Sequence, residues 1–337
     1  MSSRRFAGWL PIRVFWRDSM PLVDWCYFGN TRLTAPFFQD SVTEALRLPF
    51  NQAFRRETPI AELQEWRHAS PGLEPTAFIL HTSRCGSTLV SQILACLDSH
   101  IVMSEPPMLD TILRARYLEP AIDEDVQVEW LRALVSSLGQ ARSGETRFVI
   151  KLDAWSVFEL GLLRKAFPHT PWVYLYRDPL EIAMSQMRER GAYMIPGALG
   201  PALYMLDRKE AMAMCPEEFI ARVLGQMLAA GYAGCLHAGG RALHYRRLPQ
   251  ALWTELGNVF GIRDDAASLG KLKEAARWNA KRPQFEFVED SERKQREASP
   301  ALRDWVERWA MPAYRALEGT HAGASATEFP VLEEGTT

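Results

Sequence analysis

Residues Phe78 to Leu94 read FILHTSRCGSTLVSQIL and join an apolar run, a short polar turn and an amphipathic segment. The apolar run, residues 77–80, predicts a buried strand. Residues 87–97 then carry apolar side chains at helical spacing, so one face of the expected helix can pack on a sheet. A strand, a turn of small residues and a helix, in this order, form the architecture that surrounds phosphate groups in nucleotide-binding proteins.

The turn departs from the Walker pattern GxxxxGK[ST] at two positions. His81 stands where the first glycine is expected, and Ser87 stands where the lysine is expected. ATP hydrolysis is therefore disfavoured. Backbone N–H groups at the helix start, with the hydroxyls of Ser83, Ser87 and Thr88 and the charge of Arg84, can still bind an anion. The alternative is an ordinary structural joint between a strand and a helix.

Cys85 sits beside Arg84 at the expected helix start, and both features lower the pKa of a thiol. A phosphatase loop with a nucleophilic cysteine would need an arginine six residues further on, where this chain has Ser91. We therefore interpret Cys85 as a small residue of the loop.

The composition of the chain excludes several classes of protein. The 337 residues are 47% hydrophobic, which is enough for one large domain or two small ones. A net charge of −2 gives no positive field, so no nucleic-acid partner is expected. Five cysteines without a CxxC pair indicate reduced thiols. The sequence shows no signal peptide or membrane-spanning segment, so we expect a cytoplasmic protein with no membrane partner.

Beyond the opening stretch, short apolar runs alternate with segments of helical spacing. Strands are predicted at 77–80, 101–103, 148–150, 172–176 and 242–245, and helices at 41–46, 60–69, 87–97, 126–138, 156–167, 179–190, 216–237 and 249–260. This alternation predicts an α/β fold, a parallel β-sheet flanked by helices on both faces. Ligands bind beyond the carboxyl ends of such strands. Arg84, Lys151 and Arg177 follow three of these ends, so we expect their charges to converge.

A second stretch, YLYRDPLEIAMSQMRER from Tyr174 to Arg190, strengthens the interpretation of the loop. Arg177 directly follows the strand, Pro179 suits the first turn of a helix, and Ser185 lies about two helical turns further on. This pattern resembles the part of sulfotransferases that holds the 3′-phosphate of the co-substrate PAPS, 3′-phosphoadenosine 5′-phosphosulfate. The loop of that family, Pro-Arg-Ser-Gly-Thr-Thr-Leu-Leu, is similar to residues 83–90, which read SRCGSTLV.

The resemblance is closest to the tyrosylprotein sulfotransferases and their bacterial relatives, and it implies a P-loop NTPase-like sulfotransferase fold. The glutamate that follows the loop helix in that family matches Glu105 in MSEPP, and its catalytic lysine matches Lys151 in FVIKLDAW. The resemblance thus implies three catalytic residues, Glu105, Arg84 and Lys151. The residues that it implies for PAPS binding are Ser83, Arg84, Cys85, Gly86, Ser87, Thr88, Arg177, Ser185, Tyr245 and Lys281.

The activity implied by this resemblance is transfer of the sulfuryl group from PAPS to a hydroxyl or amine of an acceptor, with release of PAP. The acceptor would be a small molecule, a glycan or a peptide. Glu105 would take the proton of the acceptor, with a pKa raised towards the working pH. The alternative for Glu105 is a cap on a turn, and the alternative for Arg177 is an ion pair with Asp178 or Glu181. No metal is expected, because no cluster has ligand spacing.

The resemblance covers residues 76–318, which we expect to form the sulfotransferase domain. Residues 1–75 would be an N-terminal extension packed on this domain, and residues 319–337 a flexible tail. The charged run 289–296 predicts a solvated helix face. A homodimer is compatible with the sequence.

Three departures from the family keep other functions open. Cys85 replaces the serine of the loop, Ser83 its proline, and Tyr-Glu-Asp-Leu appears as YRRL from Tyr245. One alternative is a P-loop small-molecule kinase, which would need Mg-ATP and the loop lysine that this chain lacks. The other, which the altered loop keeps open, is a non-catalytic nucleotide-binding protein with a degenerate sulfotransferase fold.

Overall fold

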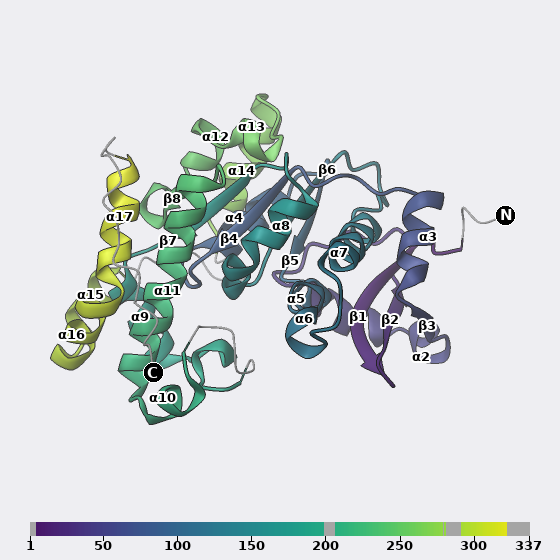
Figure 1. The fold of residues 1–337 in the computed structure, drawn as a ribbon. Helices are drawn as coiled ribbons and strands as arrows, with labels where there is room; N and C mark the ends of the chain where they lie inside the picture. The colour runs from purple at the N-terminus through teal and green to yellow at the C-terminus, as the bar shows by residue number, and fades with distance from the viewer. Residues whose placement is uncertain (1–4, 199–205, 279, 281–290, 322–337) are drawn as a thin grey trace.

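A five-stranded parallel sheet forms the centre of the protein (Figure 1). The computed structural model describes residues 5–198, 206–278, 280 and 291–321. The strands of the central sheet are β4 (Ala77–His81), β5 (His100–Ser104), β6 (Arg147–Lys151), β7 (Trp172–Tyr176) and β8 (Arg241–His244). Their order is β5-β6-β4-β7-β8, and every neighbouring pair is parallel. The predicted α/β fold is confirmed.

Alternate residues of each strand enter two different cores, because side chains of a strand point to opposite faces. In β4, Phe78 and Leu80 join the larger core, whereas Ala77 and Ile79 join the smaller one. Both faces of the sheet are therefore buried away from solvent, which explains why the central strands are rich in consecutive apolar residues.

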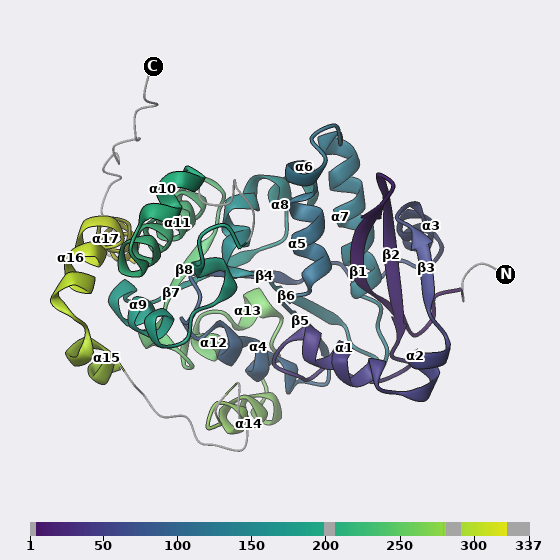
Figure 2. The same ribbon diagram turned by 90° about the horizontal axis from the view of Figure 1, so that it is seen from below.

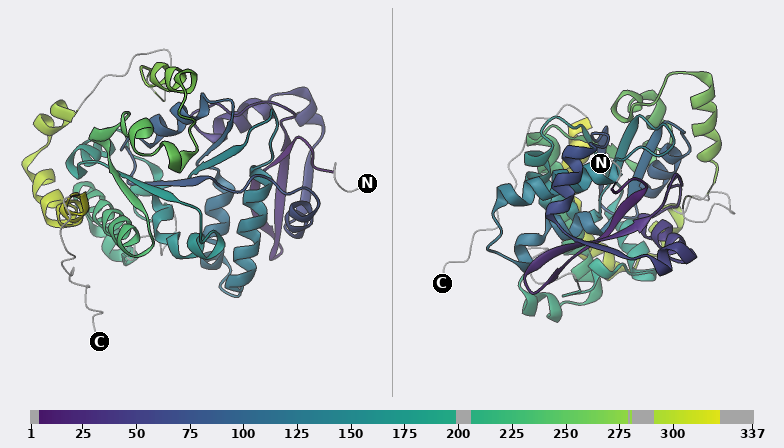
Figure 3. Two further views of the ribbon diagram at one scale, coloured as in Figure 1. Left: turned by 90° about the horizontal axis from the view of Figure 1, so that it is seen from above. Right: turned by 90° about the vertical axis from the view of Figure 1, so that its right-hand side faces the viewer.

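Helices cover both faces of the sheet (Figure 3). The helices on the smaller core are α4 (Ser87–Ala95), α12 (Ala251–Thr254), α13 (Gly257–Phe260) and α14 (Ala266–Ala275). Those on the larger core are α5 (Pro107–Leu113), α7 (Glu124–Leu138), η2 (Ala154–Glu159), α8 (Leu160–Ala166), α9 (Pro179–Arg188) and α11 (Pro216–His237), with α16 (Pro300–Trp309) and α17 (Met311–His321) outside them. Shorter elements are α6 (Ala115–Leu118), η3 (Ala192–Met194), α10 (Arg208–Ala213), η4 (Tyr245–Arg247) and α15 (Ser291–Glu297).

The N-terminal segment forms a second sheet, which the sequence did not predict. Its antiparallel strands are β1 (Trp9–Arg17), β2 (Met20–Tyr27) and β3 (Arg56–Pro59), with helices α1 (Phe38–Leu46), α2 (Pro49–Ala53) and α3 (Ala61–Ala69). Phe6 stacks on Trp25 at 4.1 Å between ring centroids, and the Trp25 indole donates to Thr58 Oγ1 at 2.9 Å. Strand β1 packs on α5 and α7 at one end of the molecule (Figure 2), and its core is continuous with that of the central sheet.

Three predicted elements differ from those observed. The helix expected at 249–260 is interrupted between α12 and α13, and the one expected at 156–167 begins as the 3-10 helix η2. Helix α17 reaches His321, so residues 319–321 continue it, while the rest of the expected tail lies outside the described residues.

Helix α11 is the only helix in the described part of the chain that is long and apolar enough to cross a membrane. Most of its apolar window is buried inside the protein, where α16 and α17 pack against it. Burial among other helices is what a core helix shows, so α11 gives only weak evidence of a membrane span.

Candidate functional site

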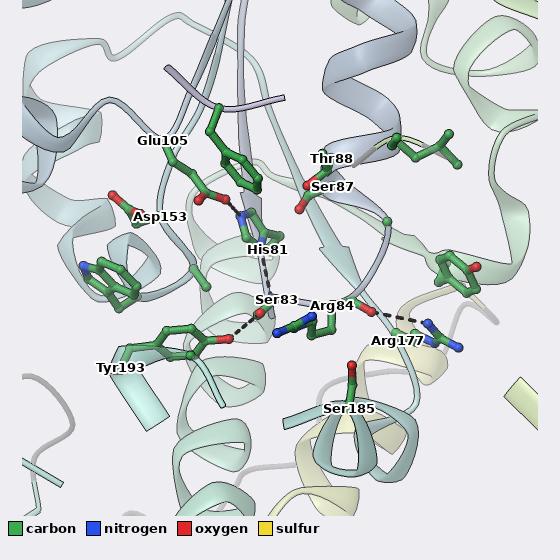
Figure 4. Close-up of a pocket in the computed structure, with 18 of the residues that line it drawn as sticks. His81, Ser83, Arg84, Ser87, Thr88, Glu105, Asp153, Arg177, Ser185 and Tyr193 are labelled. Carbon is green, nitrogen blue, oxygen red and sulfur yellow. Dashed lines mark hydrogen bonds and ion pairs between the residues drawn. The ribbon is translucent and has the colours of Figure 1, made fainter. Parts of the chain in front are cut away.

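A cavity of about 430 Å³ opens where the carboxyl ends of the parallel strands meet (Figure 4). Most of the site residues stand at a strand end: the loop follows β4, Glu105 follows β5, Lys151 ends β6, Arg177 follows β7 and Tyr245 follows β8, whereas Ser185 lies within α9. Parallel strands bring their carboxyl ends to one edge of the sheet, which is why residues far apart in sequence converge here. Of the residues predicted from the sequence, those that line the cavity are Ser83, Arg84, Gly86, Ser87, Thr88, Glu105, Arg177, Ser185 and Tyr245.

The loop between β4 and α4 turns through three residues in the left-handed region. Ser83 has φ 66°, Arg84 has φ 48° and Gly86 has φ 85°. Only glycine adopts this conformation without a steric cost, and a side chain at Gly86 would meet Tyr245 Cδ2 at 2.9 Å. The turn delivers the chain to the start of α4, where the first N–H groups have no acceptor within the helix. The loop can therefore surround an anion.

Lys151 supplies a positive charge beneath this loop from a neighbouring strand. Its side chain is fully buried, and Nζ donates to Thr88 Oγ1 at 3.3 Å. The same ammonium lies 3.0 Å from Glu105 Oε1 and 4.8 Å from the centre of the Phe37 ring. A buried lysine persists only with such partners. The cation that Ser87 does not supply is thus present, and it comes from β6.

Glu105 is held between Lys151 and His81 at the wall of the cavity. His81 Nδ1 accepts a hydrogen bond from the Ser83 N–H at 2.9 Å, so the ring nitrogen that carries a proton towards Glu105 is Nε2. Nε2 lies 3.0 Å from Leu152 O and 3.4 Å from Glu105 Oε1. Glu105 itself has φ 52°, so its backbone is strained where its side chain enters the cavity.

The expectation that the Glu105 pKa is raised is wrong. Burial alone would raise it, but the hydrogen bond with His81 and the charge of Lys151 outweigh burial and lower the pKa to about 2. The carboxylate is therefore ionised at neutral pH. It is ready to accept a proton, although it is a weaker base than the sequence suggested.

Several residues of the cavity wall were not predicted from the sequence, and four of them add aromatic or acidic side chains next to the loop. They are Phe37 from the segment before α1, Asp153 and Trp155 around the start of η2, and Tyr193 in η3. Trp155 packs on Tyr193 at 5.3 Å between ring centroids. Asp153 lies two residues after Lys151, and this proximity is the only signal in the sequence that could have predicted Asp153 as a cavity residue. Phe37 and Tyr193 arrive from distant segments and have no local pattern.

The opposite end of the cavity contains Arg177 and Ser185. Arg177 Nε donates to Glu181 Oε2 at 2.6 Å, and both side chains are almost completely buried. This is the ion pair that the sequence left open as the alternative for Arg177. The guanidinium also lies over the Tyr245 ring, 4.2 Å from its centre, and Nη2 donates to Ser291 Oγ at 3.0 Å.

Helix α15 contributes a cation that the sequence assigned to solvent. Lys294 lines the cavity and is 5% exposed, whereas Glu292, Arg293 and Arg296 are exposed, so the expected solvated face is one side of α15 and Lys294 lies on the other. A helix exposes only one side to water when its other side packs on a neighbour, here α9.

Three further predicted residues complete the comparison with the sequence. Arg84 is bound to Glu189, whose Oε2 lies 3.1 Å from Nη1 and whose backbone oxygen accepts from Nη2 at 2.8 Å. Cys85 is fully buried, and its thiol donates to Leu175 O at 3.2 Å, so it contributes backbone to the loop and points into the core. Lys281 lies outside the described residues.

No protein-family model matches the chain, and no curated protein matches it. Among solved structures, the sulfotransferase STF9 from Mycobacterium avium is similar, with 14% identity, a TM-score of 0.40, and coverage of 70% of this chain and 78% of that one. The sulfotransferase domain from the Synechococcus PCC 7002 olefin synthase is also similar, with 18% identity, a TM-score of 0.39, and coverage of 77% and 97%.

Proposed function

We propose that this protein transfers the sulfuryl group of PAPS to a hydroxyl or amine of an acceptor and releases PAP. One observation carries the proposal: a phosphate-binding loop without its own lysine lines a cavity together with Glu105 from β5 and Arg177 from β7, and the buried Lys151 of β6 contacts both the loop and Glu105. This set offers two cationic ends for a ligand with two anionic groups, and a carboxylate for the proton of an acceptor.

The described residues fit the two ends of PAPS. At one end, the left-handed turn of Ser83, Arg84 and Gly86 faces the 5′-phosphosulfate with N–H groups and hydroxyls. At the other end, Arg177 and Ser185 offer a guanidinium and a hydroxyl to the 3′-phosphate. The Tyr245 ring beside Gly86 can pack on the adenosine between them.

The roles of the side chains in the transfer follow from their charges. PAPS supplies the sulfuryl group, which forms a bond to the acceptor atom as its bond to the bridging oxygen breaks and PAP leaves. Glu105, ionised and lining the cavity, accepts the proton that the acceptor loses. Lys151 and Arg84 stabilise the negative charge that grows on the bridging and sulfuryl oxygens. The chain thus acts mainly by positioning and charge stabilisation.

The expected partner is a small-molecule, glycan or peptide acceptor. The five cysteines are free in the structure, which accords with the proposed cytoplasmic location.

Calorimetric titration of the purified protein with PAP, with Mg-ATP as the control, tests the proposal. PAP is the desulfated product, so the test needs no known acceptor. We expect binding in the micromolar range or tighter for PAP and little for Mg-ATP. Binding of Mg-ATP alone would favour the kinase. PAP binding without turnover of PAPS over a broad acceptor screen would favour the non-catalytic nucleotide-binding protein.

A further inference from the structure

The carboxyl of Asp153 has no protein partner among the described residues. Asp153 occupies the N-cap position of η2, where aspartate usually accepts backbone N–H bonds, yet its side chain makes no such bond. It lies instead on the cavity wall, on the same side as Glu105 (Figure 4), and Trp155 lines the same cavity. A polar group that gives up a local hydrogen bond and turns into a cavity is available to a ligand.

The aromatic wall beside Asp153 is held rigidly. The Trp155 indole donates to Asp110 Oδ1 at 2.6 Å, and Asp110 is paired with Arg114 at 2.7 Å. On its other side, Trp155 packs on Tyr193, whose hydroxyl hydrogen-bonds Ser83 Oγ. Both rings are therefore fixed by polar anchors, and their apolar surfaces form one side of the cavity next to an unpaired carboxyl.

Among the described residues, no positively charged side chain forms an ion pair with the Asp153 carboxyl. Lys151 is the nearest buried ammonium, and it is already paired with Glu105 at 3.0 Å. Burial and the negative charges of Glu105 and Asp110 raise the Asp153 pKa to about 8, against the opposing influence of His81 and Lys151. The charged and titratable groups that face Asp153 are Glu105, Asp110, His81 and Lys151, with Arg84 on the same cavity. A ligand that brings a positive charge would satisfy this carboxyl.

We propose that Asp153 binds a protonated amine of the acceptor, while Trp155 and Tyr193 hold its apolar or aromatic body. This inference rests on the proposed function and names its substrate class, hydroxyl-bearing amines. A protonated amine has no lone pair for attack, so the amine anchors the acceptor and the hydroxyl receives the sulfuryl group. The hydroxyl then faces Glu105, and the reaction is an O-sulfation.

The test compares two probes that differ only by an amine, tyramine and para-ethylphenol. Each is titrated calorimetrically into the full chain, with and without saturating PAP. We expect tyramine to bind the PAP-loaded protein at least about tenfold more tightly, because only tyramine can pair with a carboxylate. Binding should also release close to one proton at about pH 7 and much less at about pH 9, because the amine ionises a carboxyl that is protonated in the free protein. Titrations in buffers of different ionisation enthalpy measure this release.

The variant Asp153→Asn separates recognition from folding. It should abolish the proton release and remove most of the preference for tyramine over para-ethylphenol, while Asp153→Glu should keep a preference. Asp125→Asn is the matched control, because that exposed carboxylate on α7 is paired with Lys165. Affinity for PAP should stay within about threefold of the wild type in all three variants.

The outcomes distinguish the two proposals. If PAP binds but tyramine shows no preference over para-ethylphenol, or if neither probe binds, the acceptor inference fails and the proposed function stands. Proton release that persists in Asp153→Asn would also overturn the inference. If PAP does not bind, the proposed function fails, and the titrations without PAP still report whether Asp153 recognises an amine.

Discussion

Lys151 at the end of β6 reaches the first turn of α4, where its Nζ donates to Thr88 Oγ1 at 3.3 Å. The lysine of a Walker loop lies within the loop itself, whereas this lysine comes from the adjacent strand. Because β6 is hydrogen-bonded to β4, the loop and the ammonium belong to one rigid sheet. The position of the charge relative to the loop is therefore fixed by strand pairing.

Replacing this cation should impair catalysis more than folding. We expect Lys151→Met to lower kcat for sulfuryl transfer by about 10²–10³-fold, because it removes charge stabilisation at the reacting oxygens. It should also raise the Glu105 pKa from about 2, since Lys151 lowers that pKa, so the acid limb of the pH–rate profile should move to higher pH. Lys273→Met, at an exposed position of α14, is the control. An unchanged acid limb would contradict the pairing of Lys151 with Glu105.

Glu105→Gln should keep the shape of the site and remove the proton acceptor. We expect kcat to fall by about 10²–10⁴-fold, while affinity for PAP changes by less than about threefold because PAP does not need the carboxylate. Steady-state kinetics with PAPS, alongside PAP titration, measure both effects, with the exposed Glu65→Gln as control. Full activity in Glu105→Gln would contradict the proposed role of Glu105 as the proton acceptor.

Arg177 can be tested through a ligand that lacks the 3′-phosphate. Because Arg177 and Glu181 form a buried pair, removing only one of them leaves an unpaired charge, so the double variant Arg177→Met with Glu181→Gln is preferable. We expect it to weaken PAP binding by about 1.5–3 kcal/mol, the scale of a charged hydrogen bond. Affinity for adenosine 5′-monophosphate should hardly change. Equal losses for both nucleotides would refute recognition of the 3′-phosphate.

Gly86 gives a test of the loop backbone. Its φ is 85°, and Tyr245 and Leu248 lie so close to the place that a Cβ would occupy that alanine has no room. We expect Gly86→Ala to shift the loop and reduce PAP affinity by about tenfold or more. Gly270→Ala is a matched control, since a side chain there meets nothing within 4 Å and α14 should become slightly more stable. Retention of full PAP affinity in Gly86→Ala would mean that the loop does not bind the phosphosulfate.

The free protein should be most stabilised by Asp153→Asn at alkaline pH. The folded-state pKa of Asp153, about 8, lies above the ordinary carboxyl value, so its contribution to stability is present at low pH and is lost as pH rises from about 4 to about 8. We expect the variant to raise the free energy of unfolding by roughly 1–3 kcal/mol at about pH 9, with the gain vanishing at about pH 4. Urea unfolding at both pH values measures this, with Asp125→Asn as control. A gain that is independent of pH would mean that the pKa of the Asp153 carboxyl is not raised in the folded protein.

Much of the central sheet and of the site could be predicted from the sequence because the relevant signals are local. Four of the five central strands are built on short apolar runs, and the capping residue Asp178 with Pro179 in the first turn indicates where α9 begins. The charges of Arg84, Lys151 and Arg177 could be expected to converge, since each follows the carboxyl end of a parallel strand. The ends of the strands can be recognised from the alternating pattern of strands and helices. The positions of the loop and of the cations that follow those ends could therefore be predicted from the sequence.

Other features were decided only by the tertiary structure, because they depend on which groups meet across long sequence distances. The Glu105 pKa depends on Lys151 and His81, which lie on two other strands, and burial without these partners would have raised it. Phe37 and Tyr193 reach the cavity from segments with no readable pattern, and the N-terminal sheet depends on aromatic packing between distant residues. The sequence thus determined where the charges stand along the chain. The fold determined which of these charges are paired, how deeply they are buried, and which carboxyl is left to bind a ligand. These properties depend on distances in space, because desolvation and Coulomb energy do.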